Sequence, residues 1–273
     1  VREAAARAMQ LKGHALDKSG DLEAALATFN ALIERYAGDE DGDVRGTAAE
    51  AMRLKGRALE KSGDLEAALA TYDALVERYG GDEGSHVCET AAEARIHAAN
   101  GLIQVGLEFE RAERLLREAM PQKPLLARAN LVWLQLLTGN DQLAEDTLQE
   151  LDELPPLGKA LMSATFELRK DNFGSAMKLF KDVVGGELDQ GDWNFEDDIE
   201  RFLIVAKQKG FGERLVSWFE DTRLSEKAAP LFVAIKGFVG GEELLKDANP
   251  EVRGLARQIY ERLVTFERNF KKK

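Results

Sequence analysis

The stretch LKGHALDKSGDLEAALATFNALIERY, from Leu11 to Tyr36, returns almost unchanged as LKGRALEKSGDLEAALATYDALVERY, from Leu54 to Tyr79. The spacing between Leu11 and Leu54 is 43 residues. Because self-similarity at a fixed period is the signature of repeat architectures, we expect the chain to be built from tandem structural units rather than around one globular core.

Each copy is expected to fold as two helices. Gly20 is suited to end the first helix because glycine adopts the left-handed conformation easily, and Asp21 is suited to cap the next. The apolar residues of this second helix are spaced for one buried face: Leu22, Ala25, Leu26, Phe29, Leu32 and Ile33. A helix pair of this size cannot bury that face alone, so stacking of neighbouring pairs is predicted.

The pattern of small, bulky and turn residues resembles the tetratricopeptide repeat family. It comprises Gly13, Leu16, Gly20, Ala25 and Phe29 in the first copy, and Gly56, Leu59, Gly63, Ala68 and Tyr72 in the second. The resemblance implies an all-α fold, namely a right-handed α-solenoid of stacked antiparallel helix pairs. The period is longer than the family's usual ~34 residues. The extra residues fall in the acidic connectors AGDEDGDVRG and GGDEGSHVCE, where a longer helix or a longer loop would accommodate them.

Weaker copies of the pattern follow. The third retains Ala99, Leu102, Gly106, Ala112 and Leu116, with one extra residue after the turn; the fourth retains Gly139, Ala144 and Leu148; the fifth retains Ala164, Ala176 and Phe180, with Asp171 at the turn. We therefore predict about five tetratricopeptide-like pairs over residues 1–186, followed by a C-terminal helical extension or cap over residues 187–273. Asn249 and Pro250 mark the start of its last helix.

Composition excludes several classes of protein. The 273 residues contain a single Cys, so no internal disulfide forms, and the net charge of −12 makes nucleic-acid binding an unfavourable expectation. No apolar run is long enough to span a bilayer. The chain opens without a Met or a signal-peptide core, and we interpret it as an excised piece of a cytoplasmic protein.

The sequence offers no catalytic, cofactor or metal site. His14, His86 and His97 have no partners arranged as a triad or a metal set, and His86 and Cys88 lie in a connector. The paired glycines lack the Lys and Ser/Thr of a phosphate-binding loop, and the acidic connectors lack the ligand alternation of a calcium loop. We expect no enzyme activity from these residues. Trp193 is either a loop anchor or a contact residue, and the sequence does not decide between them.

One polar stripe differs between the first two copies. Arg7, Gln10, His14 and Asp17 become Glu50, Arg53, Arg57 and Glu60, at steps of 3, 4 and 3 that line one helix face. In the tetratricopeptide repeat family the first helices line a concave groove. Carried over by position, the partner-binding residues would be Gln10, His14, Arg53, Arg57, Ile96, Asn100 and Trp133. The alternative is a solvated face that drifted after duplication, or for Trp133 a place in the core.

The expected function is a non-catalytic scaffold that binds a peptide or helix of a partner protein in this groove. Arg53 and Arg57, with Lys18, Lys61 and His14 nearby, favour an acidic peptide, but Glu50, Glu60 and Glu93 are placed to neutralise them, and both outcomes stay open. Only Asn100 matches the carboxylate clamp of some family members. Two alternatives remain: a regulatory module that controls an effector enzyme, and a self-assembling oligomer module.

Overall fold

The computed structural model describes residues 1–81, 85–151, 154–185, 195–222, 229–246 and 248–270, and these residues form helices and connecting turns without a strand. The helices of the first half are α1 (Arg2–Ser19), α2 (Leu22–Tyr36), α3 (Gly42–Ser62), α4 (Leu65–Tyr79), α5 (Ser85–Gln104), α6 (Phe109–Ala119) and α7 (Pro124–Thr138). Those of the second half are α8 (Asp141–Gln149), α9 (Pro156–Arg169), α10 (Phe173–Gly185), α11 (Phe195–Gln208), α12 (Gly212–Asp221), α14 (Ala229–Gly240), the 3₁₀ helix η1 (Glu242–Leu245) and α15 (Pro250–Phe270). The predicted all-α fold is confirmed.

The chain divides into two compact units, Val1–Asn130 and Leu131–Lys273, with the boundary inside α7. The boundary predicted between residues 186 and 187 marks the end of the sequence repeat. The boundary inside α7 is defined differently, by the contacts between residues. The repeat boundary therefore stays a prediction, and each compact unit is described below by itself.

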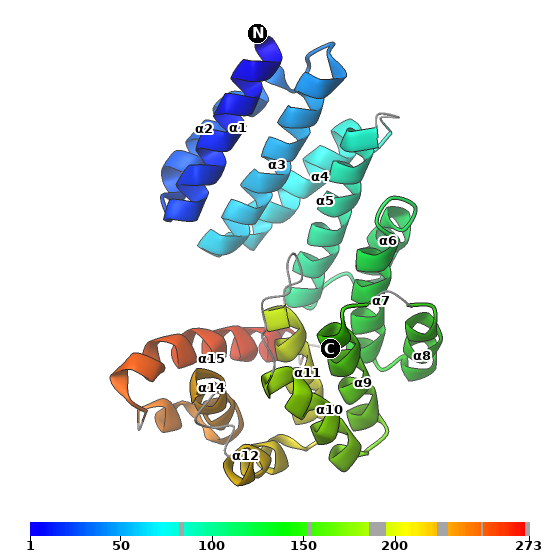
Figure 1. Ribbon diagram of the computed structural model, residues 1–273, viewed down its shortest axis with the longest axis vertical. Coiled ribbons are helices and arrows are strands. Elements are labelled where there is room, and N and C mark those ends of the chain that lie inside the picture. The colour runs from blue at the N-terminus through cyan, green and yellow to red at the C-terminus, as the bar shows by residue number, and fades with distance from the viewer. Residues whose placement is uncertain (82–84, 152–153, 186–194, 223–228, 247, 271–273) are drawn as a thin grey trace. The chain divides into compact units, whose positions relative to one another are not determined.

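In the first unit, helix pairs stack side by side. The pairs are α1 with α2, α3 with α4, and α5 with α6, and each trailing helix α2 and α4 also packs against the next leading helix. The leading helix α3 contacts both α1 and α5, so the three leading helices form one continuous layer (Figure 1). This is the stacked-pair arrangement that the repeat predicted.

The turn inside each of the first two pairs follows the predicted chemistry. Gly20 has φ 85° and Gly63 has φ 84°, a left-handed conformation that ends α1 and α3. The Asp21 backbone N–H then donates to the carbonyl oxygen of Leu16 at 3.0 Å, while its carboxylate accepts from the Ala24 N–H at 3.2 Å and caps α2. Asp64 caps α4 in the same way.

The extra residues of the long period lengthen the leading helix rather than the loop. Helix α3 has 21 residues and the trailing helix α4 has 15, whereas Asp41 already caps the start of α3 through the Asp43 N–H at 3.0 Å. The connector is fixed from the next copy, because the Tyr79 hydroxyl donates to the Ala37 carbonyl at 2.9 Å. Of the two alternatives that the sequence left open, the longer helix is correct for the first connector.

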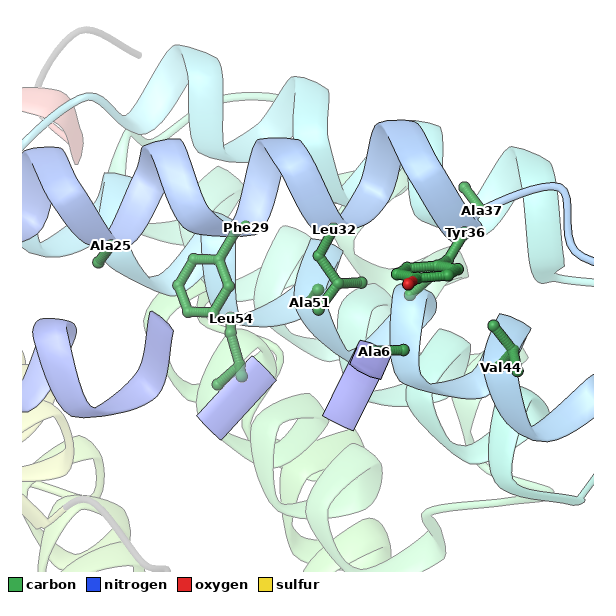
Figure 2. Packing of buried hydrophobic residues seen from close by; sticks show 10 residues of the cluster. Ala6, Ala25, Phe29, Leu32, Tyr36, Ala37, Val44, Ala51 and Leu54 are labelled. Atoms are coloured by element: carbon green, nitrogen blue, oxygen red, sulfur yellow. The ribbon is translucent and has the colours of Figure 1, made fainter. Parts of the chain in front are cut away.

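The core between the first two copies is an apolar cluster shared by α1, α2 and α3. Phe29, Leu32 and Tyr36 project from α2 toward the α3 side chains Ala51 and Leu54 (Figure 2). In each of the first two pairs a glycine, Gly13 or Gly56, makes room for the aromatic ring of the trailing helix. A Cβ added at Gly56 would lie 2.3 Å from the Tyr72 ring, and helices approach this closely only without that atom.

The second unit repeats the same turn. Asp171, with φ 62°, and Gly210, with φ 77°, end α9 and α11, and the next residue in each case donates its N–H back to the carbonyl five residues before it, as Asp21 does. Phe180 and Phe219 each follow their turn residue by the interval that separates Gly20 from Phe29, and both are fully buried. The α11–α12 connection therefore has the same turn and the same aromatic position as the repeats, in a region where the sequence pattern had faded.

Packing in the second unit centres on aromatic rings. Phe180 of α10 stacks on Phe202 of α11 with centroids 4.3 Å apart, and its ring lies 6.1 Å from that of Phe219 in α12. Phe219 in turn contacts Phe232 of α14 at 5.6 Å. These four rings thus connect the helices α10, α11, α12 and α14.

The last helix begins as predicted. Asn249 accepts from the Glu251 N–H at 3.0 Å, and Pro250 is the first residue of α15. Leu255 of α15 is 51% exposed, whereas Ala256 and Leu263 lie in the core. The reason is geometric, because Ala256 lies four residues after Val252 and seven before Leu263, on the face that packs against α14. Whether α15 caps the solenoid stays a prediction.

Candidate functional site: the polar stripe of the leading helices

Five of the predicted binding residues lie on the layer of leading helices and are half-buried. They are Gln10 and His14 on α1, Arg53 and Arg57 on α3, and Asn100 on α5. The repeat brings them onto adjacent helices because residues 43 apart occupy the same position of successive leading helices. The His14 Nδ1 atom is buried and has no hydrogen-bond partner among the described residues. The stripe therefore combines partly desolvated polar groups on neighbouring helices.

Arg53 is held in a local ion-pair network. Its Nε and Nη2 atoms donate to the Glu50 carboxylate at 2.8 and 2.6 Å, and its Nε lies 3.3 Å from the Glu93 carboxylate on α5. Burial lowers the pKa of Arg53, but the hydrogen bonds and charges of Glu50 and Glu93 outweigh burial and raise it. Glu93 also pairs with Lys123 at 2.7 Å. Arg53 therefore ties α3 to α5, and its charge is largely compensated.

Arg57, one turn further along α3, differs from Arg53. No carboxylate of the described residues lies within ion-pair distance of its guanidinium, although the side chain is only half-exposed. Lys61, one turn beyond Arg57 on α3, forms an ion pair with Asp17 of α1 at 2.6 Å. Of the cations that the sequence grouped into a basic strip, Arg53 and Lys61 thus form ion pairs within the protein, whereas Arg57 forms none with the described residues.

Two of the predicted binding residues lie in the core instead. Ile96 is 6% exposed and Trp133 is 1% exposed. Trp133 belongs to the second unit, where the Arg201 guanidinium lies 5.8 Å from its ring and pairs with Asp198 at 3.1 Å. Neither residue offers a surface to a partner, so both drop out of the candidate site. Trp193 lies outside the described residues.

Sequence reasoning missed His97, which lies beside the stripe on α5. Its imidazole ring stacks on Tyr72 of α4 with centroids 5.4 Å apart and planes 14° from parallel. His97 occupies the same repeat position as Leu11 and Leu54. A polar residue at a position that is apolar in the other two copies is the feature of the sequence that could have identified it. Burial, and then the charges of Arg53 and Arg57, lower the pKa of His97 to about 3.

This shift predicts acid sensitivity. Unfolded histidine titrates near pKa ~6.5, so between that pH and about 3 the unfolded chain binds a proton that the folded chain does not. Stability therefore falls as the pH falls, by about 2 kcal/mol at pH ~5. The measurement is the free energy of urea unfolding above pH ~6.5 and at pH ~5. We expect His97→Phe, which retains a ring against Tyr72, to remove most of the loss between these two conditions. The exposed His86→Gln variant is the control, and an equal acid loss in wild type and His97→Phe would refute the assignment.

The described part of the chain has neither a metal-binding cluster nor a membrane-spanning helix. No group of three or more His, Cys, Asp or Glu side chains there is arranged to hold a metal ion. Cys88, at the start of α5, is partly buried and takes part in a contact of its own. No helix among the described residues combines the length and the apolar character needed to cross a membrane.

Comparison with known proteins agrees with the repeat geometry. Residues 11–83 match the family model described as tetratricopeptide repeat. The crystal structure of a tetratricopeptide repeat protein from Parabacteroides merdae ATCC 43184 is similar over 95% of this chain and 98% of that chain, with a TM-score of 0.53 and 15% sequence identity. A comparison with curated proteins gives no match. The first two copies are therefore tetratricopeptide repeats, and the chain has the fold of a tetratricopeptide repeat protein.

Proposed function

We propose that the layer of leading helices in the first unit binds an extended peptide or a helix of a partner protein. Tetratricopeptide repeats generally mediate protein–protein interactions, and proteins of this family are typically non-catalytic scaffolds. Support for this face comes from the half-buried polar stripe that α1, α3 and α5 share. Four of the nine positions that differ between residues 1–36 and 44–79 lie on this stripe, while the buried positions behind it keep apolar residues.

The observation that carries the proposal is the uncompensated charge of Arg57. A guanidinium that is half-buried and unpaired in the free protein gains a strong charge-assisted hydrogen bond when a carboxylate arrives. Arg53 cannot serve in this way without breaking its contacts to Glu50 and Glu93. The favoured ligand is accordingly an acidic peptide with a carboxylate at Arg57, and His14 and Asn100 supply neighbouring polar contacts.

A charge-reversal pair tests the proposal. Peptides that bind the full chain are selected from a library of acidic sequences, and their Kd values are measured by fluorescence anisotropy on each variant. We expect Arg57→Glu to weaken binding by about tenfold or more, because it replaces an attractive charge with a repulsive one. The matched control is Arg78→Glu on the trailing helix α4, where the side chain is exposed.

The control makes the result specific. Because Arg57→Glu and Arg78→Glu change the net charge equally, a general electrostatic effect would weaken binding in both. Equal Kd values for wild type and Arg57→Glu would exclude the proposed anchor. Regulation of an effector enzyme and self-assembly remain alternative predictions. The peptide-binding measurement does not test them, and each needs an experiment of its own.

A further inference from the structure

The ion pair between Lys61 of α3 and Asp17 of α1 is unevenly buried. The Lys61 Nζ atom lies 2.6 Å from Asp17 Oδ2, so the pair joins two neighbouring leading helices. The Lys61 side chain is 47% exposed, whereas the Asp17 side chain is 9% exposed. A group that approaches this face from solvent therefore meets the ammonium first, with the carboxylate buried behind it.

The pair leaves Lys61 able to bind a further group. An ammonium carries three N–H donors, and among the described residues only the Asp17 carboxylate accepts from one of them. Lys61 also lies four residues after Arg57, and side chains at this spacing are neighbours on one face of a helix. The two cations of α3 are therefore placed side by side, and both reach solvent in part.

The exposed cation is specific to the first junction between copies. The positions of Asp17 and Lys61 recur 43 residues later as Glu60 and Gln104, so the junction of α3 with α5 has no cation at this place. The Glu60 carboxylate lies near the Tyr72 hydroxyl of α4, because burial, and then the charge of Glu60, raise the pKa of that hydroxyl. Acidic groups of a ligand are therefore attracted to the junction of α1 with α3 rather than to the next one.

We propose that Lys61 is a second anchor for the ligand, which carries two neighbouring acidic side chains, one for Arg57 and one for Lys61. This inference rests on the peptide-binding face proposed above and specifies the ligand of that face. Residues four apart on a helix have Cβ atoms about 5–6 Å apart, so the two acidic groups are expected at a similar separation. Asp17 sets the strength of the second contact, because its charge offsets part of the charge of Lys61.

Double-mutant cycles between protein and peptide test the second anchor. The acidic peptides selected on the full chain are remade with each Asp or Glu changed in turn to Asn or Gln, and Kd is measured on wild type, Arg57→Gln and Lys61→Gln. We expect Lys61→Gln to weaken binding about threefold or more. One peptide position should lose its effect in Lys61→Gln, and a different position should lose its effect in Arg57→Gln.

Asp17→Asn should change the affinity in the opposite direction. Without the buried carboxylate the charge of Lys61 is uncompensated, so acidic peptides should bind about threefold more tightly. The gain should vanish when Lys61→Gln is added to Asp17→Asn, because the gain acts through Lys61. The matched control is Glu34→Gln on the trailing helix α2, which changes the net charge equally at an exposed site.

Two outcomes would overturn the second anchor. The first is a wild-type Kd for every peptide in Lys61→Gln. The second is a gain in Asp17→Asn no larger than in Glu34→Gln, which would assign the gain to net charge alone. Both outcomes leave the peptide-binding face standing if Arg57→Glu still weakens binding, whereas wild-type binding by Arg57→Glu would remove the face itself.

Discussion

Gly56→Ala is expected to destabilise the protein by about 2 kcal/mol, although alanine is the better helix former. The added Cβ would lie 2.3 Å from Tyr72 Cε1, and the Tyr72 ring is fully buried between α3, α4 and α5. The ring has no room to retreat, so α3 and α4 must move apart. The gain in helix propensity, roughly 0.8–1 kcal/mol, offsets part of the larger packing loss.

A glycine in open space provides the matched control. Gly254 lies inside α15, and a Cβ built there meets no atom within 4 Å. Gly254→Ala should therefore stabilise by about 0.5–1 kcal/mol, the ordinary effect of replacing glycine in a helix. The check is urea unfolding of both variants, with hydrogen exchange to assign the loss to α3 and α4. A neutral or stabilising Gly56→Ala would contradict the close packing of the pair.

Phe180→Ala should cost about 3–5 kcal/mol in the second unit. The ring is fully buried and touches rings from two other helices, at 4.3 Å from Phe202 and 6.1 Å from Phe219. Truncation leaves a cavity among rigid aromatic neighbours that cannot collapse to fill it. The Trp218 ring lies 5.9 Å from Phe180, so its fluorescence should change in the same transition.

The half-buried Phe232 of α14 is the control for ring loss. It contacts Phe219 at 5.6 Å but keeps part of its surface in solvent, so Phe232→Ala should cost clearly less than Phe180→Ala in thermal and urea unfolding. Equal losses in the two variants would mean that Phe180 does not hold α10, α11 and α12 together as this account requires.

Much of the fold could be predicted from the sequence because the same helix, turn and cap residues occur in two nearly identical copies. The turn at Gly20, the cap at Asp21 and the ring at Phe29 are local features that follow from residue type and spacing. The repeat-like turn between α11 and α12 was harder to detect, because Gly210 and Phe219 are retained whereas the small residues between them are replaced. A left-handed turn followed by an aromatic residue at the repeat interval is the part of the pattern that persists.

The candidate site was only partly predictable, because burial and pairing depend on neighbours that sequence does not position. Gln10, Arg53 and Ile96 occupy the same position of three successive leading helices. Gln10 and Arg53 are half-buried, whereas the apolar Ile96 is buried in the core. The compensation of Arg53 depends on Glu93, which comes from the next helix pair. Spacing within one helix could locate the stripe but could not tell that Arg57, rather than Arg53, keeps an uncompensated charge.

A hydrogen-exchange footprint of the full chain with a bound acidic peptide would show directly which helices form the binding face. We expect the peptide to slow exchange on the leading helices α1, α3 and α5, with the strongest effect around Arg57, and Arg57→Glu to remove the footprint. Slowed exchange confined to the trailing helices α2, α4 and α6 would contradict this expectation, since the binding wall would then be built from the other helix of each pair.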